Sequence, residues 1–272
     1  MKLSTLAVPV FALTTLLLTA PLTASAQQWA KARLDNSPRH LEFVEVKHDN
    51  RVVQSFVAYP EVKDKATAVV VIHEIFGLSD WVRGVTDQFA EAGYIAIAPD
   101  LLWGMGPKGG GTAELGGPDN VRPFIQKLPP DQVTSDLNAV VEYASKLPAC
   151  NGKVVVIGFC WGGGQSFRLA TNNKDIKAAM VFYGTGPTEA AEIAKIHVPV
   201  YGFYAGNDAR INATLPKTIE AMSELKKTFD PVTYEGAGHG FMRAGEAPDT
   251  NEANKKARDD AWARWKKLLA AI

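Results

Sequence analysis

The chain has 272 residues, of which 46% are hydrophobic, and its 29 basic and 29 acidic residues give a formal net charge of zero at pH 7. This length is sufficient for one large domain with a substantial core. The balanced charges contain no long run of one sign, so the sequence indicates neither nucleic acid nor an anionic membrane as the partner.

The first 26 residues have the organisation of a secretory signal peptide. Lys2 supplies a positive charge, residues 8–18 form an apolar segment, and Ala24-Ser25-Ala26 provides a cleavage site of small residues. The apolar segment is shorter than the ~20 residues that span a bilayer, so we expect cleavage rather than a stable membrane anchor. The sequence thus predicts an exported protein, periplasmic or secreted, in which residues 27–272 form a single domain.

Strand and helix patterns alternate along the rest of the chain. After a short polar segment, the alternating stretches 41–47 and 51–59 predict an antiparallel hairpin at a sheet edge. Apolar runs typical of strands buried on both faces of a parallel sheet follow at 68–72, 94–98, 153–158, 178–182, 198–204 and 232–235. Helical patterns lie at 80–92, 131–146, 163–171, 188–194, 215–228 and 252–271. We therefore predict an α/β fold with a mostly parallel, doubly wound sheet flanked by helices.

One glycine-rich segment, Trp103 to Asn120, interrupts this alternation and has no apolar periodicity. It lacks the G-x-x-x-x-G-K-[ST] pattern of a phosphate-binding loop. Long irregular loops in compact domains are commonly either mobile or functional. A flexible surface loop and a lid near the active site are therefore the two interpretations of this segment.

The two cysteines, Cys150 and Cys160, lie at opposite ends of the predicted strand 153–158. A strand advances about 3.3 Å per residue, which separates their Cα atoms by far more than the ~7 Å that a disulfide allows. We therefore expect two free thiols.

Cys160 occupies a position where hydrolases commonly carry a serine. The stretch Gly158-Phe159-Cys160-Trp161-Gly162 follows an apolar run and matches G-x-S-x-G with cysteine in place of serine. Such a strand-turn-helix elbow holds its central side chain at a helix N-terminus, which favours the thiolate form. The alternative interpretation is a buried cysteine that packs as a small hydrophobic residue.

An acid and a histidine follow the last two predicted strands. Asp208 lies just beyond the run 198–204, and His239 lies beyond the run 232–235. Nucleophile, acid and histidine occur in this order in α/β-hydrolases. We expect His239 to accept the thiol proton and later protonate the leaving group, while Asp208 fixes the histidine tautomer. Taken singly, Asp208 could be a turn residue and His239 a loop residue.

The segment His73-Glu74-Ile75-Phe76-Gly77 follows the first predicted parallel strand. Glycine replaces the second histidine of the zinc-binding pattern H-E-x-x-H, so we predict no metal site. In this fold the backbone N–H groups of Ile75 and Trp161 would form the oxyanion hole. Glu74 would lie beside the elbow, where it either competes for the thiol proton or moves aside for an anionic substrate. A loop carboxylate facing water is the other interpretation.

In combination, the cysteine elbow, the HEIFG segment, Asp208 and His239 resemble the dienelactone hydrolase (carboxymethylenebutenolidase) family of the α/β-hydrolase superfamily. The resemblance extends from about residue 41 to the C-terminus. It implies an α/β-hydrolase fold. It also implies cofactor-free hydrolysis of a small ester or lactone through a thioester acyl-enzyme.

The resemblance also implies roles for residues around the elbow. The glutamate that matches Glu74 contacts the resting cysteine in this family and swings away when substrate binds. Arg243 has the place of an arginine that holds the substrate carboxylate, and Tyr183 matches a tyrosine that lines the pocket. The chain departs from the family in its signal peptide and in its glycine-rich stretch, which replaces the segment bearing a second carboxylate-binding arginine. Arg122 is the candidate substitute.

Two other functions compete with hydrolysis. One is a catalytically quiet ligand-binding or thiol-sensing protein that has kept the fold, although the presence of Cys160, Asp208 and His239 favours an enzyme. The other is an acyltransferase, which the sequence does not separate from a hydrolase. We expect a small-molecule substrate and a monomer. Aromatic residues available either for a pocket wall or for the core are Phe76, Trp81, Trp103, Phe124 and Trp161.

Overall fold

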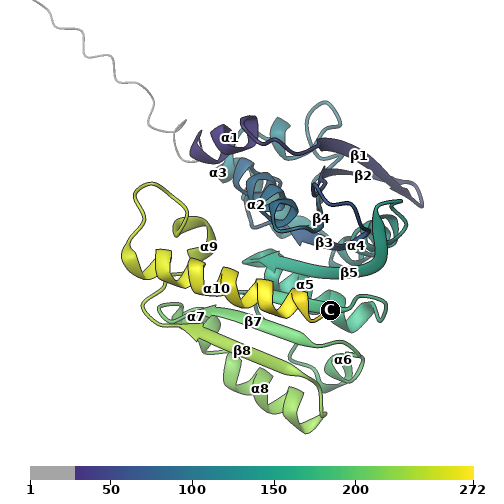
Figure 1. Cartoon of the computed structure of the whole chain (residues 1–272). Coiled ribbons are helices and arrows are strands. Elements are labelled where there is room, and N and C mark those ends of the chain that lie inside the picture. Colours follow the sequence, from purple (N-terminus) through teal and green to yellow (C-terminus); the bar gives the residue numbers. More distant parts are fainter. Residues whose placement is uncertain (1–27) are drawn as a thin grey trace, which may run out of the picture.

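One sheet of eight strands organises residues 28–272, the part of the chain that this computed structural model describes (Figure 1). The strands are β1 (Leu41–His48), β2 (Arg51–Ala58), β3 (Ala66–Ile72), β4 (Ile95–Pro99), β5 (Cys150–Phe159), β6 (Ala178–Phe182), β7 (Val200–Ala205) and β8 (Phe229–Tyr234). Their spatial order is β1-β2-β4-β3-β5-β6-β7-β8. β1 and β2 form an antiparallel pair, β2 is antiparallel to β4, and strands β3 to β8 are mutually parallel. The predicted α/β fold with its N-terminal hairpin is confirmed.

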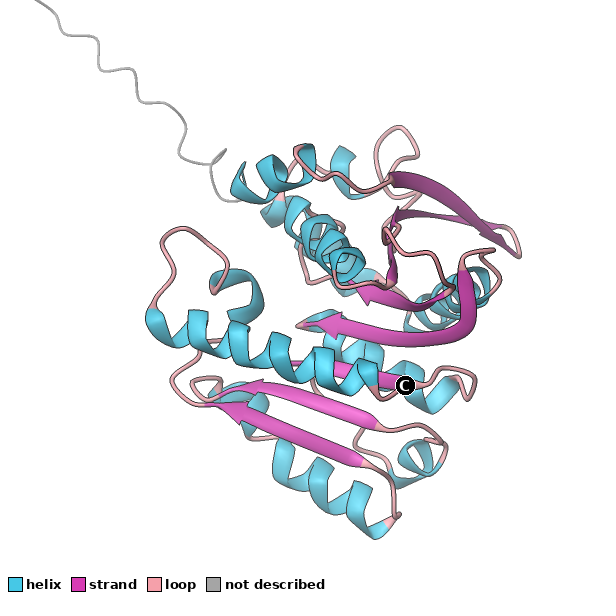
Figure 2. Ribbon diagram, in the orientation of Figure 1, coloured by secondary structure: helices cyan, strands magenta, loops and turns pink. Residues whose placement is uncertain are grey.

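Helices cover both faces of this sheet (Figure 2). One face carries α1 (Gln28–Asp35), α2 (Asp80–Glu91) and α10 (Glu252–Ala270). The other carries α4 (Pro130–Ser145), α5 (Trp161–Asn172) and α8 (Leu215–Glu224). Shorter or peripheral elements are α3 (Pro118–Lys127), α6 (Ala190–Ala194), α7 (Ala209–Asn212), α9 (Phe241–Ala244) and the 3₁₀ helix η2 (Thr112–Glu114). The predicted signal peptide, residues 1–26, lies outside the described residues.

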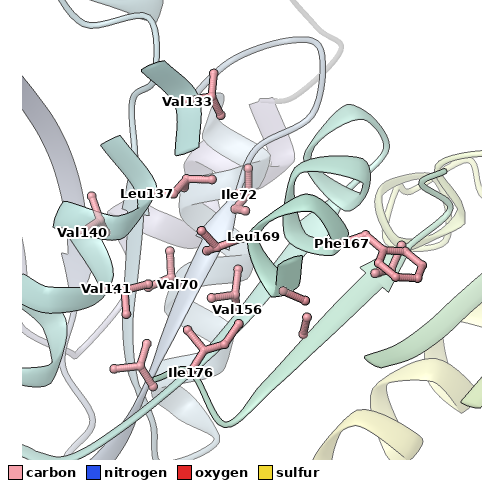
Figure 3. Close-up of a cluster of buried hydrophobic side chains, with 14 of the residues drawn as sticks. Val70, Ile72, Val133, Leu137, Val140, Val141, Val156, Phe167, Leu169 and Ile176 are labelled. Atoms are coloured by element: carbon pink, nitrogen blue, oxygen red, sulfur yellow. The ribbon is translucent and has the colours of Figure 1, made fainter. Parts of the chain in front are cut away.

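Alternate residues of the central strands enter two separate hydrophobic clusters, because side chains of a strand point to opposite faces. Val70 and Val156 pack with side chains of α4 and α5 such as Leu137 (Figure 3). Their neighbours Val69 and Val155 belong to the opposite cluster, beneath α2 and α10. With both faces covered, the central strands hold the loops at their carboxyl ends in fixed positions.

The last strand differs from its prediction. We expected 232–235 to be buried on both faces, but β8 starts at Phe229 and only Tyr234 in it is buried. β8 is the edge of the sheet and pairs with β7 alone. An edge position also tolerates Pro231, which has no N–H to donate to a neighbouring strand.

The glycine-rich segment folds back on itself. The backbone N–H groups of Gly104 and Gly106 both donate to the carbonyl of Gly110, at 3.0 and 2.8 Å. The carboxylate of Glu114 accepts from the backbone N–H groups of Lys108 and Gly110. The expectation of an irregular stretch as far as residue 120 is wrong, because η2 lies within it and α3 already begins at Pro118.

Candidate active site

The predicted elbow places Cys160 between β5 and α5. Its backbone has φ 56° and ψ −117°, and its N–H donates to the carbonyl of Phe182 at 3.0 Å. A Cβ at Gly158 would overlap the carbonyl of Gly162, and a Cβ at Gly162 would overlap the carbonyl of His73. Glycine is therefore required on both sides of the cysteine, which explains the G-x-C-x-G spacing.

Cys160, Asp208 and His239 come together at the carboxyl edge of the sheet. Asp208 follows β7 and is buried, and its carboxylate bonds to Nδ1 of His239. His239 follows β8, and its Nε2 lies 3.1 Å from the sulfur of Cys160. Asp208 also caps α7 by accepting from the N–H of Ile211 at 3.3 Å, which restricts its side chain. The three predicted residues thus form one continuous series of contacts.

Two asparagines hold the histidine loop in place. The N–H and side-chain amide of Asn207 donate to the carbonyls of Ala237 and Gly236, at 2.9 and 3.0 Å. Asn254 on α10 accepts from the N–H of Gly238 at 2.8 Å. These bonds connect the loop after β7, the loop after β8 and α10. Sequence reasoning missed both asparagines because neither belongs to a recognised motif.

The environment of Cys160 favours the neutral thiol. Burial and the nearby carboxylate of Glu74 raise the pKa of Cys160 to about 11, although the N–H groups of Trp161 and Ile75 and the charge of Arg210 act in the opposite direction. The N–H of Trp161, at the helix N-terminus, lowers the pKa of Cys160 as expected, but desolvation of the sulfur is the larger effect. The same contacts show that both expected oxyanion-hole N–H groups face the sulfur.

Glu74 is buried, with 2% of its surface exposed, so the interpretation as a loop carboxylate facing water is wrong. Nε of Arg243 donates to its Oε2 at 2.9 Å, and burial raises the pKa of Glu74 despite this arginine. The guanidinium of Arg243 also lies 5.2 Å from the ring centre of Phe76. The arginine that the resemblance assigns to a substrate carboxylate is thus paired with Glu74 in this structure.

A cavity of about 610 Å³ opens above Cys160 and His239. Tyr183 lines it as expected, and its ring meets that of His239 edge to face at 5.1 Å. Arg122 on α3 also reaches the cavity, as does Arg210 on α7. Sequence reasoning missed Arg210, whose only signal was its place two residues after the acid. The cavity wall is therefore rich in arginine.

The five aromatic candidates separate into three groups. Phe76 and Trp161 line the cavity of Cys160, whereas Trp103 lines a neighbouring cavity. Trp81 is buried and packs edge to face against Phe159, and Phe124 packs against the hydrophobic cluster beneath α4.

Neither a metal-binding cluster nor a membrane-spanning helix occurs in residues 28–272. This part of the chain contains no group of three or more histidine, cysteine, aspartate or glutamate side chains able to hold a metal. It also contains no helix that is long and apolar enough to cross a membrane.

Removing the charge of Glu74 should make Cys160 more reactive. Because the carboxylate raises the pKa of the thiol, Glu74→Gln should lower that pKa and increase the thiolate fraction at pH 8. We expect alkylation of Cys160 by iodoacetamide to accelerate by at least about threefold. The rate would be measured by mass spectrometry in two proteins, Cys150→Ala alone and Cys150→Ala combined with Glu74→Gln. An unchanged or slower rate would show that Glu74 does not restrain the thiol.

Comparison with known proteins gives one consistent match. A model described as the dienelactone hydrolase family matches residues 53–272. A Saccharolobus solfataricus protein named "Putative carboxymethylenebutenolidase" is 31% identical over 258 residues, which covers 82% of this chain and 96% of that protein. A Salmonella typhi protein of the same name is 32% identical over 221 residues, which covers 77% of this chain and 79% of that protein. The crystal structure of a "Putative Dienelactone Hydrolase" from Klebsiella pneumoniae is 25% identical, with a TM-score of 0.74, and covers 86% of this chain and 99% of that one.

Proposed function

Because the chain belongs to the dienelactone hydrolase family, we propose that it hydrolyses small carboxylic esters or lactones with Cys160 as its nucleophile. One observation carries this proposal: the continuous contacts from Asp208 through His239 to the sulfur of Cys160. A cysteine beside a histidine that a carboxylate orients is the arrangement of an activated nucleophile.

Acylation begins with transfer of the thiol proton to Nε2 of His239. The sulfur then forms a bond to the carbonyl carbon, and the displaced π electrons move onto the carbonyl oxygen. The N–H groups of Ile75 and Trp161 stabilise this oxyanion. When the intermediate collapses, the bond from carbon to the alcohol oxygen breaks, and His239 returns the proton to that oxygen. A thioester on Cys160 remains, and with a lactone the released alcohol stays attached to the acyl group.

Deacylation reverses these roles with water as the nucleophile. His239 accepts a proton from water, the oxygen attacks the thioester carbon, and the sulfur leaves and regains its proton. Asp208 keeps the proton-accepting nitrogen of His239 directed at the sulfur throughout. The net reaction consumes one water and releases an acid and an alcohol.

Glu74 and Arg243 connect substrate binding to the state of the thiol. A substrate carboxylate that pairs with Arg243 would compete with Glu74 for the guanidinium. Since burial raises the pKa of Glu74, the released carboxylate accepts a proton more readily than one at the surface. Glu74 then either moves away from the sulfur or takes the thiol proton in place of His239 and later gives it to the leaving oxygen. Both responses favour the nucleophile when an anionic substrate is present.

The charge of Arg243 should therefore select for anionic substrates. We expect Arg243→Gln to lower kcat/KM for a carboxylate-bearing lactone by about 10- to 100-fold, the range that a lost hydrogen bond between charged groups produces. A neutral ester of similar size serves as the control substrate, and its kcat/KM should fall much less. Equal losses on the two substrates would remove Arg243 as the carboxylate anchor.

The hydrolase proposal is tested by product release from an activated small ester and from a carboxylate-bearing lactone. We expect turnover of at least one, and the lactone should be preferred. A folded protein that turns over neither would point to the quiet ligand-binding alternative. Product formation that requires an added alcohol or amine would instead identify an acyltransferase.

We further propose that the enzyme acts outside the cytoplasm, because residues 1–26 have the features of a cleaved signal peptide. Sequencing the N-terminus of protein from the cell envelope or culture medium tests this. A mature chain beginning at Gln27 supports export, whereas a cytoplasmic chain beginning at Met1 contradicts it.

A further inference from the structure

A second cavity of about 610 Å³ lies beside the catalytic one, and Phe76 is a wall of both. Its other aromatic walls are Phe43 on β1 and Trp103 in the glycine-rich segment. The rest of the lining comes from Gln54 on β2, Asp100, residues 111–113 and the starts of α2 and α3. None of the steps proposed above uses this cavity.

Hydrogen bonds fix one wall of this cavity. Thr112 donates to the carboxylate of Asp100 through both its N–H and its hydroxyl, at 2.7 and 2.8 Å. The same hydroxyl accepts from the N–H of Leu78 at 3.0 Å, which attaches the glycine-rich segment to the loop that carries Phe76. A Cβ at Gly111 would overlap the carboxylate of Asp100, so glycine is needed for this approach. A wall fixed in this way costs little ordering entropy when a ligand enters.

Apart from Gln54, the polar side chains of this wall bond to one another or to backbone N–H groups. Asp80 is paired with Arg83, and Ser79 accepts from the N–H at the start of α2. Asp100 is satisfied by the threonine just described. The surface left for a ligand is therefore mainly aromatic and aliphatic.

Phe43 is the solvent-exposed part of this aromatic wall. It is 49% exposed, among the most exposed large hydrophobic side chains of the described residues. An exposed aromatic ring at the mouth of an aromatic cavity gains by covering an apolar group. The position of Phe76 connects that group to catalysis, because this ring also borders the cavity that contains Cys160.

We propose that this second cavity binds an aryl-sized apolar group of the substrate while the ester or lactone carbonyl lies at Cys160. The inference rests on the proposed hydrolase function and names the substrate class for it: esters or lactones that carry an aromatic substituent some distance from the reacting carbonyl. The arginines of the catalytic cavity then bind the anionic part of such a substrate, and the aromatic cavity binds its apolar part.

Two series of esters test this proposal. In ω-phenylalkyl acetates the ring is on the alcohol, and in ethyl ω-phenylalkanoates it is on the acid, with one to four methylenes as the spacer. We expect at least one of these phenylalkyl compounds to exceed ethyl acetate in kcat/KM by about 10- to 100-fold, the effect of burying one large apolar group. Trp103→Ala and Phe43→Ala should each reduce the ratio of these two kcat/KM values at least threefold. Ile219→Ala, which removes an exposed hydrophobic residue elsewhere, should leave the ratio unchanged.

A binding measurement keeps this inference separate from the hydrolase proposal. We expect isothermal titration calorimetry, with 4-phenylbutanol added to the protein, to show saturable binding to the unmodified protein and weaker binding to Trp103→Ala. Suppose that ethyl acetate and both phenylalkyl series resist hydrolysis while 4-phenylbutanol still binds and Trp103→Ala weakens this binding. The hydrolase proposal then fails and the aromatic site stands. If the esters are hydrolysed but the variants change neither the ratio nor the binding, the aromatic site is overturned and the hydrolase stands. Absence of binding to the unmodified protein also overturns it.

Discussion

Replacing Cys160 by alanine is expected to lower kcat for ester or lactone hydrolysis by more than about 10⁴-fold, since loss of a nucleophile removes the covalent route entirely. The substitution changes only the side chain at the tip of the elbow, so the fold and the cavity should persist. Activity of the unmodified and variant proteins would be compared on the same activated ester and lactone.

The chain offers a matched control for this experiment. Cys150, the other thiol, is buried at the start of β5, away from the cavity of Cys160. Cys150→Ala removes the same atoms and should retain most of the activity. If Cys160→Ala kept a tenth or more of the activity, or if both variants lost it equally, Cys160 would not be the nucleophile.

Asp208→Asn is expected to cause the next largest loss, about 10³- to 10⁴-fold in kcat, by analogy with the same change in serine hydrolases. The amide N–H would donate to Nδ1 of His239 and leave its proton on Nε2. That nitrogen faces the sulfur at 3.1 Å and could no longer accept the thiol proton. Asparagine still caps α7, so the loss should not arise from unfolding.

The control for this change is Asp175→Asn on the exposed surface, which should leave kcat unchanged. Circular dichroism and melting temperature would confirm that both variants are folded. A loss of less than about tenfold in Asp208→Asn would contradict the tautomer-fixing role.

Residues that follow strand ends were the most predictable part of the site. Cys160 and His239 are recognisable because a predicted strand and a glycine precede each of them, and the parallel sheet then brings the segments that follow its strands to one edge. Gly158 and Gly162 are required because other backbone atoms lie where their Cβ atoms would be, so the sequence carries them at a fixed spacing around Cys160.

The electrostatics of the site could not be predicted in the same way. The pKa of Cys160 depends on the balance between the helix N-terminus, burial and Glu74, and a local motif contains only the first of these. The pairing of Glu74 with Arg243 joins residues 169 positions apart. No local pattern carries such a contact, nor the bonds by which Asn207 and Asn254 hold the histidine loop.

The glycine-rich segment shows a further limit of sequence reasoning. Its shape depends on backbone bonds to Gly110 and on the attachment of Thr112 to Asp100, and neither produces a periodic pattern. Among the described residues, none from 103 to 120 lines the catalytic cavity. The cavity lining therefore does not support the interpretation of this segment as a lid over the active site. The segment instead lines the aromatic cavity.

The central claim, a thioester formed on Cys160, is tested most directly by intact-protein mass spectrometry on a rapidly quenched reaction. With a lactone we predict a transient gain equal to the full mass of the lactone, because its alcohol stays attached after ring opening. Peptide mapping should locate this adduct on Cys160 in the unmodified protein and in Cys150→Ala. An adduct on another residue, or full turnover by Cys160→Ala, would contradict the claim.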